Sequence, residues 1–147
     1  MFRSQRGRLR AAAALAALAL LGAAGCGRSA PPGTAAAAAS PGARLYLNNC
    51  VACHQPHGEG LRGVQPPLTG TPVTIGDPAQ LLAWVMFGRR PAALPKGAYS
   101  ALMPQFAYLP DEELAVLLSY VRSSWGNAAA PVTAAMVARA RAANRGD

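Results

Sequence analysis

The sequence predicts an all-α domain of three to four helices, and two observations carry that prediction. Three segments combine a residue that caps helix N-termini with apolar side chains at helical spacing. No stretch of the chain alternates polar and apolar residues with the two-residue period of a half-buried strand. Strong helix signals without strand signals indicate a domain of packed helices.

The first two helices each begin with a capping residue that is followed directly by proline. Ser40 can cap a helix that has Pro41 in its first position and runs toward Asn49. Asp77 can cap a second helix, which also begins with proline and ends at Gly88. Glycine is a natural stop because it readily takes the left-handed conformation that closes a helix.

The third helix is expected from Asp111 to Trp125, with Gly126 ending it. Its first turn is acidic, which suits the positive end of the helix dipole. Long loops are expected at 55–76 and 89–105. The apolar residues of the third helix fall on one face: Leu114, Leu117, Leu118, Val121 and Trp125.

The formal charge of +8 comes mostly from the two ends of the chain. Four arginines lie in the first ten residues, and residues 128–147 hold three more against one acid. Residues 41–127 contain six cations and five anions, so this region is nearly neutral. Without a basic face interleaved with aromatic residues, a nucleic-acid partner is not expected.

Residues 1–25 have the features of an export signal. Four arginines precede an uncharged Ala/Leu run at 11–24, which is too short to span a membrane. A buried Ala/Leu helix is the alternative, but it gives the four arginines no role. We therefore expect export to the bacterial periplasm.

Cys26 follows Leu-Gly-Ala-Ala-Gly, which resembles the cleavage site of bacterial lipoproteins. In such signals the cysteine becomes the first mature residue and carries lipid, which predicts a membrane anchor through Cys26. The alternative is an ordinary secretory signal with an unmodified cysteine. Residues 26–40 are expected to form a flexible Ala/Pro linker, because residues 27–40 hold no aromatic residue and no aliphatic residue larger than alanine.

The segment Cys50-Val51-Ala52-Cys53-His54 is the attachment pattern for haem c. Two thiols three positions apart can form thioethers with the two vinyl groups of one haem, and the adjacent histidine can supply a nitrogen to the iron. Residues 41–127 are few for a self-sufficient core, and a haem would add apolar surface for the helices to enclose.

Three other readings of this motif compete with haem attachment. A redox Cys-x-x-Cys normally follows a strand in an alternating strand-helix pattern, and the sequence shows none. A zinc site needs four ligands, of which His57 could at best supply the last. A plain disulfide leaves the adjacent His54 unexplained.

A haem iron that carries electrons needs a sixth ligand, and Met103 is the strongest candidate. Pro104 forbids helix through Met103, so the thioether is expected on extended backbone in a loop. His57 is too close to the motif to reach the opposite face of the ring. Met86 lies in an apolar helical run that favours core packing, and Met136 lies in the Ala-rich tail.

These motifs together resemble the class I c-type cytochromes over residues 41–127. The resemblance rests on the haem motif near the start of the domain and on three later segments: Pro66-Pro67-Leu68-Thr69-Gly70, Met103-Pro104-Gln105-Phe106, and a final helix that ends in the segment Tyr120 to Asn127. Within this family the chain is similar to the small cytochrome subunits of periplasmic dehydrogenases.

The resemblance implies a small fold around one covalently bound haem c, held by Cys50 and Cys53, with His54 and Met103 as axial ligands. It implies that the carbonyl of Pro66 accepts the ring N–H of His54, which fixes the tautomer of the histidine. It also implies a contact between the first and last helices in which Gly42 and Tyr46 meet Tyr120.

The function that follows is single-electron transfer in a periplasmic or membrane respiratory chain, between a dehydrogenase or quinol-oxidising complex and a terminal acceptor. The chain is then an electron carrier or electron-transfer subunit and not an enzyme, and it has no small-molecule substrate. Its partners are redox proteins: a dehydrogenase, an oxidase or another cytochrome. The alternative is a haem protein with an open or exchangeable sixth site, which would be a gas- or peroxide-binding sensor or enzyme.

Residues 128–147 form an Ala/Arg-rich tail beyond the predicted domain. Thr133 can cap a helix over 134–143, which would pack on the domain, and the alternative is a basic arm.

Overall fold

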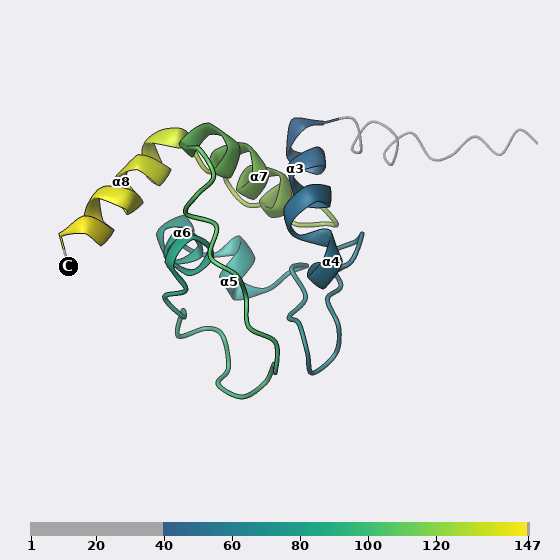
Figure 1. Ribbon diagram of the computed structural model, residues 1–147. Helices are drawn as coiled ribbons and strands as arrows, with labels where there is room; N and C mark the ends of the chain where they lie inside the picture. The colour runs from purple at the N-terminus through teal and green to yellow at the C-terminus, as the bar shows by residue number, and fades with distance from the viewer. Residues whose placement is uncertain (1–39, 147) are drawn as a thin grey trace, which may run out of the picture. The chain divides into compact units, whose positions relative to one another are not determined.

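The computed structural model describes residues 40–146, and it contains helices but no extended strand within that range. The expected signal peptide, Cys26 and almost all of the linker lie outside the described residues. The only β pairing in the described range is an isolated bridge between Leu61 and Gln65. The all-α prediction is confirmed. The helices in chain order are α3 (Pro41–Asn49), α4 (Val51–His54), α5 (Pro72–Ile75), α6 (Pro78–Phe87), α7 (Asp111–Ser123) and α8 (Ala134–Arg145) (Figure 1).

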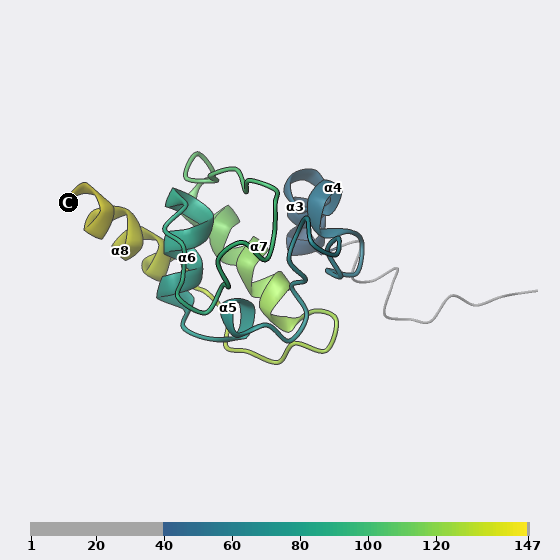
Figure 2. The same cartoon turned by 90° about the horizontal axis from the view of Figure 1, so that it is seen from below.

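Helix α7 is the centre of the packing. It contacts α3 on one side and α8 on the other, and α5 and α6 lie below it in Figure 1. The view turned by 90° shows the same order, with α7 between the α3–α4 pair and α8 (Figure 2). The predicted apolar face of α7 forms much of the core, since each of these side chains is at least 95% buried: Leu114, Leu117, Leu118 and Val121.

The predicted helix starts are confirmed by their caps. The Ser40 hydroxyl accepts a hydrogen bond from the backbone N–H of Ala43 at 3.1 Å. The Asp77 carboxylate accepts one from Ala79 at 2.9 Å, and Gly88 ends α6 with a left-handed backbone (φ 69°). These caps satisfy backbone groups that the helices themselves leave unpaired.

The predicted end of the third helix is wrong by two residues, because α7 stops at Ser123. Trp125 lies outside the helix with φ at 54°, and its ring packs against Tyr46 and Tyr120 with centroid separations of 4.9 and 5.6 Å. The indole therefore reaches the apolar region from a turn and not from the helix face. Burial of three rings against one another outweighs the cost of this backbone conformation.

The segment 55–76, expected to be a loop, contains the short helix α5. Its cap repeats the signal of the other two helices, since the Thr71 hydroxyl accepts from the N–H of Thr74 at 3.3 Å and Pro72 follows. With four residues, α5 is too short to show helical periodicity.

A buried arginine connects α7 to the segments on either side of it. Arg122 is 2% exposed and donates to the carbonyls of Thr74 and Gly76 at 2.7 and 3.0 Å, and to that of Ala130 at 2.8 Å. Burial lowers the pKa of this guanidinium, and nearby Asp77 opposes the shift. Arg122 thus supplies a donor to the buried carbonyl of Thr74 and binds the chain on either side through Gly76 and Ala130.

The tail forms helix α8, capped by Thr133, and this helix packs against α6 and α7. Val137 anchors α8 because its side chain is fully buried. No helix within 40–146 combines the length and apolar character needed to cross a membrane.

The crossing of α3 over α7 depends on Gly42, which gives the first mutational test. A β-carbon at Gly42 would lie 2.5 Å from Cβ of Tyr120 and 2.8 Å from the carbonyl oxygen of Val116. We expect Gly42→Ala to lower the free energy of unfolding by about 2 kcal/mol, because overpacking at a helix crossing exceeds the gain in helix propensity. Denaturant titration of the haem-loaded protein measures this loss.

Gly146→Ala is the control, because a β-carbon there meets nothing closer than 3.8 Å. A Gly42→Ala variant as stable as Gly146→Ala would contradict the packing described for the α3–α7 crossing.

Candidate functional site

The haem motif lies where α3 gives way to α4. Cys50 closes α3, with its N–H bonded to the carbonyl of Tyr46 at 2.8 Å, and His54 is the last residue of α4. The hydroxyl of buried Tyr46 donates to the carbonyl of Gln55 at 2.6 Å. Tyr46 therefore joins the α3–α7 crossing to the residue directly after His54.

The His54 ring is oriented by the segment 60–66. Its Nδ1 lies 3.0 Å from the carbonyl oxygen of Pro66. A carbonyl can only accept, so Nδ1 carries a proton, and in the neutral ring Nε2 then keeps a lone pair. Burial lowers the pKa of His54, and the bond to Pro66 opposes this shift. The ring is thus neutral with a nitrogen available to a metal.

The Pro66 carbonyl reaches His54 because a tight loop carries it there. Leu61 and Gln65 pair through backbone hydrogen bonds of 3.0 and 2.8 Å, and the N–H of Gly60 donates to the carbonyl of His54 at 3.0 Å. Gly60 has φ at 66°, and a β-carbon there would lie 2.5 Å from the Pro66 oxygen. The geometry of the histidine bond requires glycine at this position.

The two cysteines of the motif differ in exposure. Cys50 is partly buried, and burial, with a smaller contribution from Cys53, raises the pKa of its thiol to about 12. Cys53 is exposed. Redox-active Cys-x-x-Cys motifs depend on a lowered thiol pKa, so the environment of Cys50 is unlike that of a dithiol oxidoreductase.

Met103 lies in the loop between α6 and α7, where the sequence placed it. It is partly buried and packs against the apolar core. Just beyond it, the N–H of Phe106 donates to the carbonyl of Val85 on α6 at 3.0 Å. The other candidates lie as expected, since His57 is exposed and Met86 is fully buried in the core.

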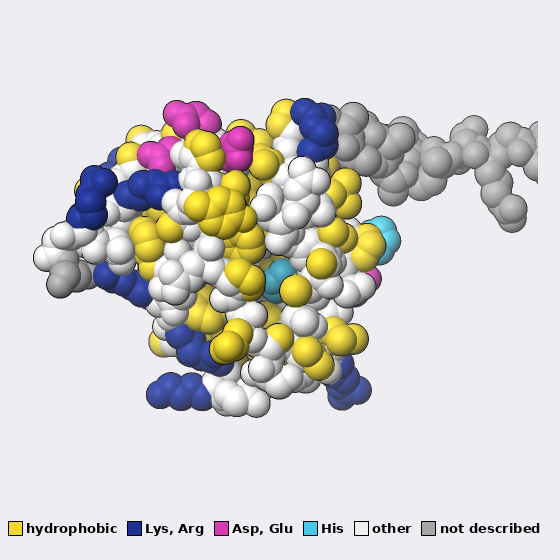
Figure 3. Space-filling view, viewed as in Figure 1, with side chains coloured by type: hydrophobic (Ala, Val, Ile, Leu, Met, Phe, Trp, Pro, Cys, Tyr) yellow, Lys and Arg dark blue, Asp and Glu magenta, His cyan; other side chains and the backbone are white. Residues whose placement is uncertain are grey.

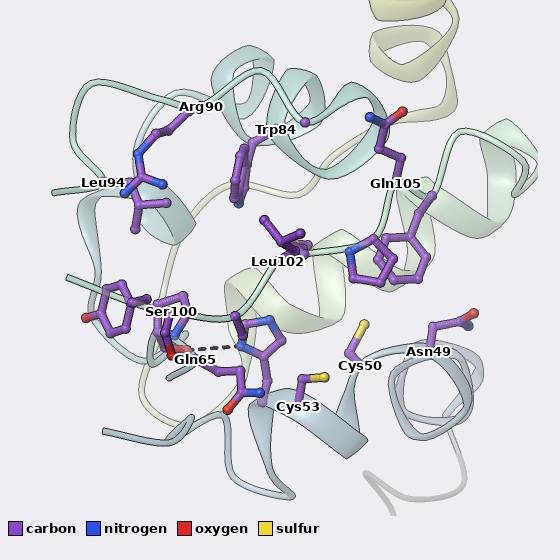
Figure 4. A pocket seen from close by; sticks show the side chains of 18 residues that line it. Asn49, Cys50, Cys53, Gln65, Trp84, Arg90, Leu94, Ser100, Leu102 and Gln105 are labelled. Carbon is purple, nitrogen blue, oxygen red and sulfur yellow. Dashed lines mark hydrogen bonds between the residues drawn. The ribbon is translucent and has the colours of Figure 1, made fainter. Parts of the chain in front are cut away.

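A cavity of about 370 Å³ brings together all five residues that the sequence assigned to the haem: Cys50, Cys53, His54, Pro66 and Met103. A second cavity of about 240 Å³ adjoins it, and His54 and Met103 line both. The sulfur atom of Cys50, at the junction of α3 and α4, and that of Cys53 in α4 face this hollow, and Trp84 enters it from α6 on the opposite side (Figure 4).

The walls of the cavity fit an apolar ring with one anionic edge. Among the described residues, the only formally charged side chain that lines the larger cavity is Arg90, which lies across the cavity from the cysteines (Figure 4). The guanidinium of Arg90 donates to the carbonyl of Pro95, which holds it beside the cavity. Haem has this polarity, with vinyl groups along one edge and carboxylates along another.

Sequence reasoning missed several residues of this wall: Gln65, Trp84, Arg90, Leu94 and Tyr99. Most of them lie in loops without periodic pattern, so no helix face pointed to them. The length of the loop after α6 was the available signal, because long ordered loops in small domains commonly carry functional residues.

The part of the chain that the structure describes offers no set of side chains that could bind zinc. There, no three side chains among histidine, cysteine, aspartate and glutamate come together in a way that could hold a metal ion.

Known proteins match more than half of this chain. A quinone-dependent alcohol dehydrogenase cytochrome c subunit from Gluconobacter oxydans is 39% identical over 88 residues, which cover 58% of this chain and 18% of that subunit. A cytochrome c-552 from Thermus thermophilus is 36% identical over 101 residues, which cover 65% of this chain and 68% of that protein.

A gluconate 2-dehydrogenase cytochrome c subunit from Pantoea cypripedii is 38% identical over 107 residues, which cover 68% of this chain and 24% of that subunit. The aligned region thus spans about a quarter or less of these two dehydrogenase subunits and about two thirds of the Thermus cytochrome.

The helical fold, the haem motif and the cavity define a c-type cytochrome. The chain belongs to the family described as cytochrome c oxidase, cbb3-type, subunit III, which matches residues 37–121. The predictions of a class I c-type cytochrome and of haem c as its cofactor are confirmed. The chain holds one haem motif, and its relatives include a cytochrome c-552, so it is a mono-haem electron carrier. The matches give no support to the alternative with an open sixth site.

Gly60 provides a test of the loop that orients His54. Gly60→Ala would force the Pro66 carbonyl away from the imidazole, and we expect it to lower the free energy of unfolding by about 1–3 kcal/mol more than Gly63→Ala. Gly63 also has positive φ, at 71°, but a β-carbon there meets no atom within 4 Å. Both substitutions strain the backbone because both positions have positive φ, but only Gly60→Ala also introduces a steric clash. The difference between the free energies of unfolding of the two haem-loaded variants, measured with denaturant, therefore gives the cost of the clash. Equal losses for the two variants would contradict the role given to Gly60.

Proposed function

We propose that Cys50 and Cys53 attach the haem through thioether bonds, and that Nε2 of His54 and the sulfur of Met103 are the axial ligands. The observation that carries this proposal is the meeting of these side chains at one cavity from separate parts of the chain. The bond from His54 to the Pro66 carbonyl supports it, because it presents the unprotonated nitrogen. We further propose residues 41–127 as the cytochrome domain.

When bound, the haem supplies an iron centre that takes up and releases one electron. Binding of the iron by the methionine sulfur raises the reduction potential of that centre. The chain's own residues exclude water and hold the ligands. Buried Phe106 and the apolar wall formed by Trp84 and Leu94 keep the site of low polarity. A wall of fixed side chains limits the rearrangement that accompanies a change in iron charge.

Electron exchange occurs, in this proposal, at the edge of the haem nearest the cysteines. Cys53 is exposed, so this edge of the cavity lies at the surface. Acidic side chains gather at the start of α7 and basic ones along α8 (Figure 3). With near-neutral charge over the domain, docking depends on shape and apolar contact, which suits brief, small interfaces.

We propose that the partners are redox proteins of a periplasmic or membrane respiratory chain. The dehydrogenase subunits among the matched proteins support a dehydrogenase as electron donor. The family description supports a terminal oxidase as acceptor.

Met103 gives the first test of the haem ligands. We expect Met103→Leu to abolish the weak red absorption band of Met-ligated ferric haem and to lower the reduction potential, because leucine has no donor atom. Met86→Leu is the matched control, since Met86 is fully buried in the core and should keep the band. Visible spectra of the two variants decide the point. An unchanged red band in Met103→Leu would exclude Met103 as ligand and would mean that another methionine binds the iron.

We also propose that residues 1–25 are a cleaved export signal and that Cys26 is lipidated, so that the linker 26–40 tethers the domain to a membrane in the periplasm. The arginine-led apolar run and the small residues before Cys26 support this.

Cys26→Ala tests the anchor. We expect the variant to leave the membrane fraction for the soluble periplasmic fraction and to lose the added acyl mass on the intact protein, because the lipid is the attachment. Fractionation and mass spectrometry of wild type and variant measure both. A wild-type protein that carries no acyl mass would contradict the lipid anchor.

A further inference from the structure

The C-terminal helix reaches back to the loop that holds Met103. Arg141 of α8 donates through Nε to the carboxylate of Asp111 at 2.6 Å. The two terminal nitrogens of its guanidinium donate to the carbonyls of Ala107 and Leu109. One side chain from the tail therefore binds three points in the segment that runs from the ligand loop into α7.

This contact is partly shielded from water. The side chains of Arg141 and Asp111 are 25% and 28% exposed. Charge-assisted hydrogen bonds with this degree of burial are stronger than the usual surface ion pair. The planar guanidinium matches the geometry, since its fixed fork of donors can bond two carbonyls and a carboxylate together.

Helix α8 itself is held firmly enough to serve as a support. Val137, one turn before Arg141, is fully buried, and Val132 before the helix is 4% exposed. The Ser119 hydroxyl of α7 donates to the Val132 carbonyl and accepts from its N–H, at 3.0 and 2.9 Å. The tail is thus fixed to α7 before it reaches the loop.

The loop after Met103 has two other attachments, and they come from different helices. Phe106 bonds to Val85 of α6, as described above. The Tyr108 hydroxyl lies 3.2 Å from the amide oxygen of Asn49, which directly precedes Cys50. Arg141 binds the carbonyls on both sides of Tyr108, so it completes a three-sided hold on the segment that begins at Met103.

We propose that Arg141 is a positioning residue for the sixth ligand: it fixes the 104–110 segment so that the Met103 thioether stays at the cavity. This inference rests on the proposed role of Met103. It gives the tail a function in electron transfer, because a ligand that leaves the iron readily exposes the site to water and to other ligands.

The test is competition between Met103 and added imidazole for the ferric haem of the full holoprotein. We expect Arg141→Ala to raise the apparent affinity for imidazole about tenfold over wild type, because loss of the triple contact weakens the hold on Met103. Arg141→Lys keeps the charge beside Asp111 but not the planar fork, and we expect a rise of about threefold. Titrations followed by loss of the red band measure the affinities.

Two controls separate positioning from general destabilisation. Arg139→Ala removes the same charge from an exposed site on the same helix, and we expect no change in imidazole affinity. Val137→Ala weakens the packing of α8 but removes no hydrogen bond to the loop, and thermal unfolding of the holoprotein ranks its stability against Arg141→Ala.

The proposal is supported if the Arg141 variants bind imidazole more tightly than a Val137→Ala protein of equal or lower stability. Wild-type affinity in Arg141→Ala would overturn it, and so would an equal rise in Val137→Ala. If the Arg141→Ala holoprotein cannot be obtained, the imidazole affinity of Arg141→Lys alone tests the proposal. A wild-type protein without the red band would overturn the proposed ligation itself, and this inference with it.

Discussion

The fold depends on a hollow that its own side chains do not fill. In the described residues, a cavity of about 370 Å³ lies where helices α4 and α6 face the loops at 60–68 and 89–106. An apolar hollow of this size forfeits the contacts that stabilise a small domain. In the proposed site the haem replaces these contacts, so that cofactor binding and folding depend on each other. The chain without its haem is correspondingly expected to be poorly folded.

Different elements hold the two sides of the cavity in place. The crossing of α3 and α7, with the rings of Tyr46, Tyr120 and Trp125, fixes the cysteine–histidine side. The ring of Trp125 lies against Gly58, so even the turn after α7 touches the loop that follows His54. The methionine side is a loop without regular structure, and it is held by contacts from α6, α3 and α8. Ligand geometry on that side therefore depends on residues remote in sequence.

Local chemistry was predictable from the sequence, and long-range contact was not. The caps at Ser40 and Asp77, the apolar face of α7 and the haem motif are all patterns within a few residues. Trp125 was assigned to a helix because its spacing fits one, and only the packing of its ring explains the turn. No local sequence pattern marks Arg141 or Gly60 as important. Their roles depend on contacts with residues that lie between 5 and 34 positions away in the sequence.

The central claim is that His54 and Met103 hold one haem between them. Proton NMR of the reduced wild-type holoprotein tests it most directly, because the ring current of the haem displaces the resonances of a bound methionine far upfield. We expect one such methyl signal, with through-space contacts that assign it to Met103. A spectrum without an upfield methyl signal, or with that signal assigned to Met86 or Met136, would contradict it.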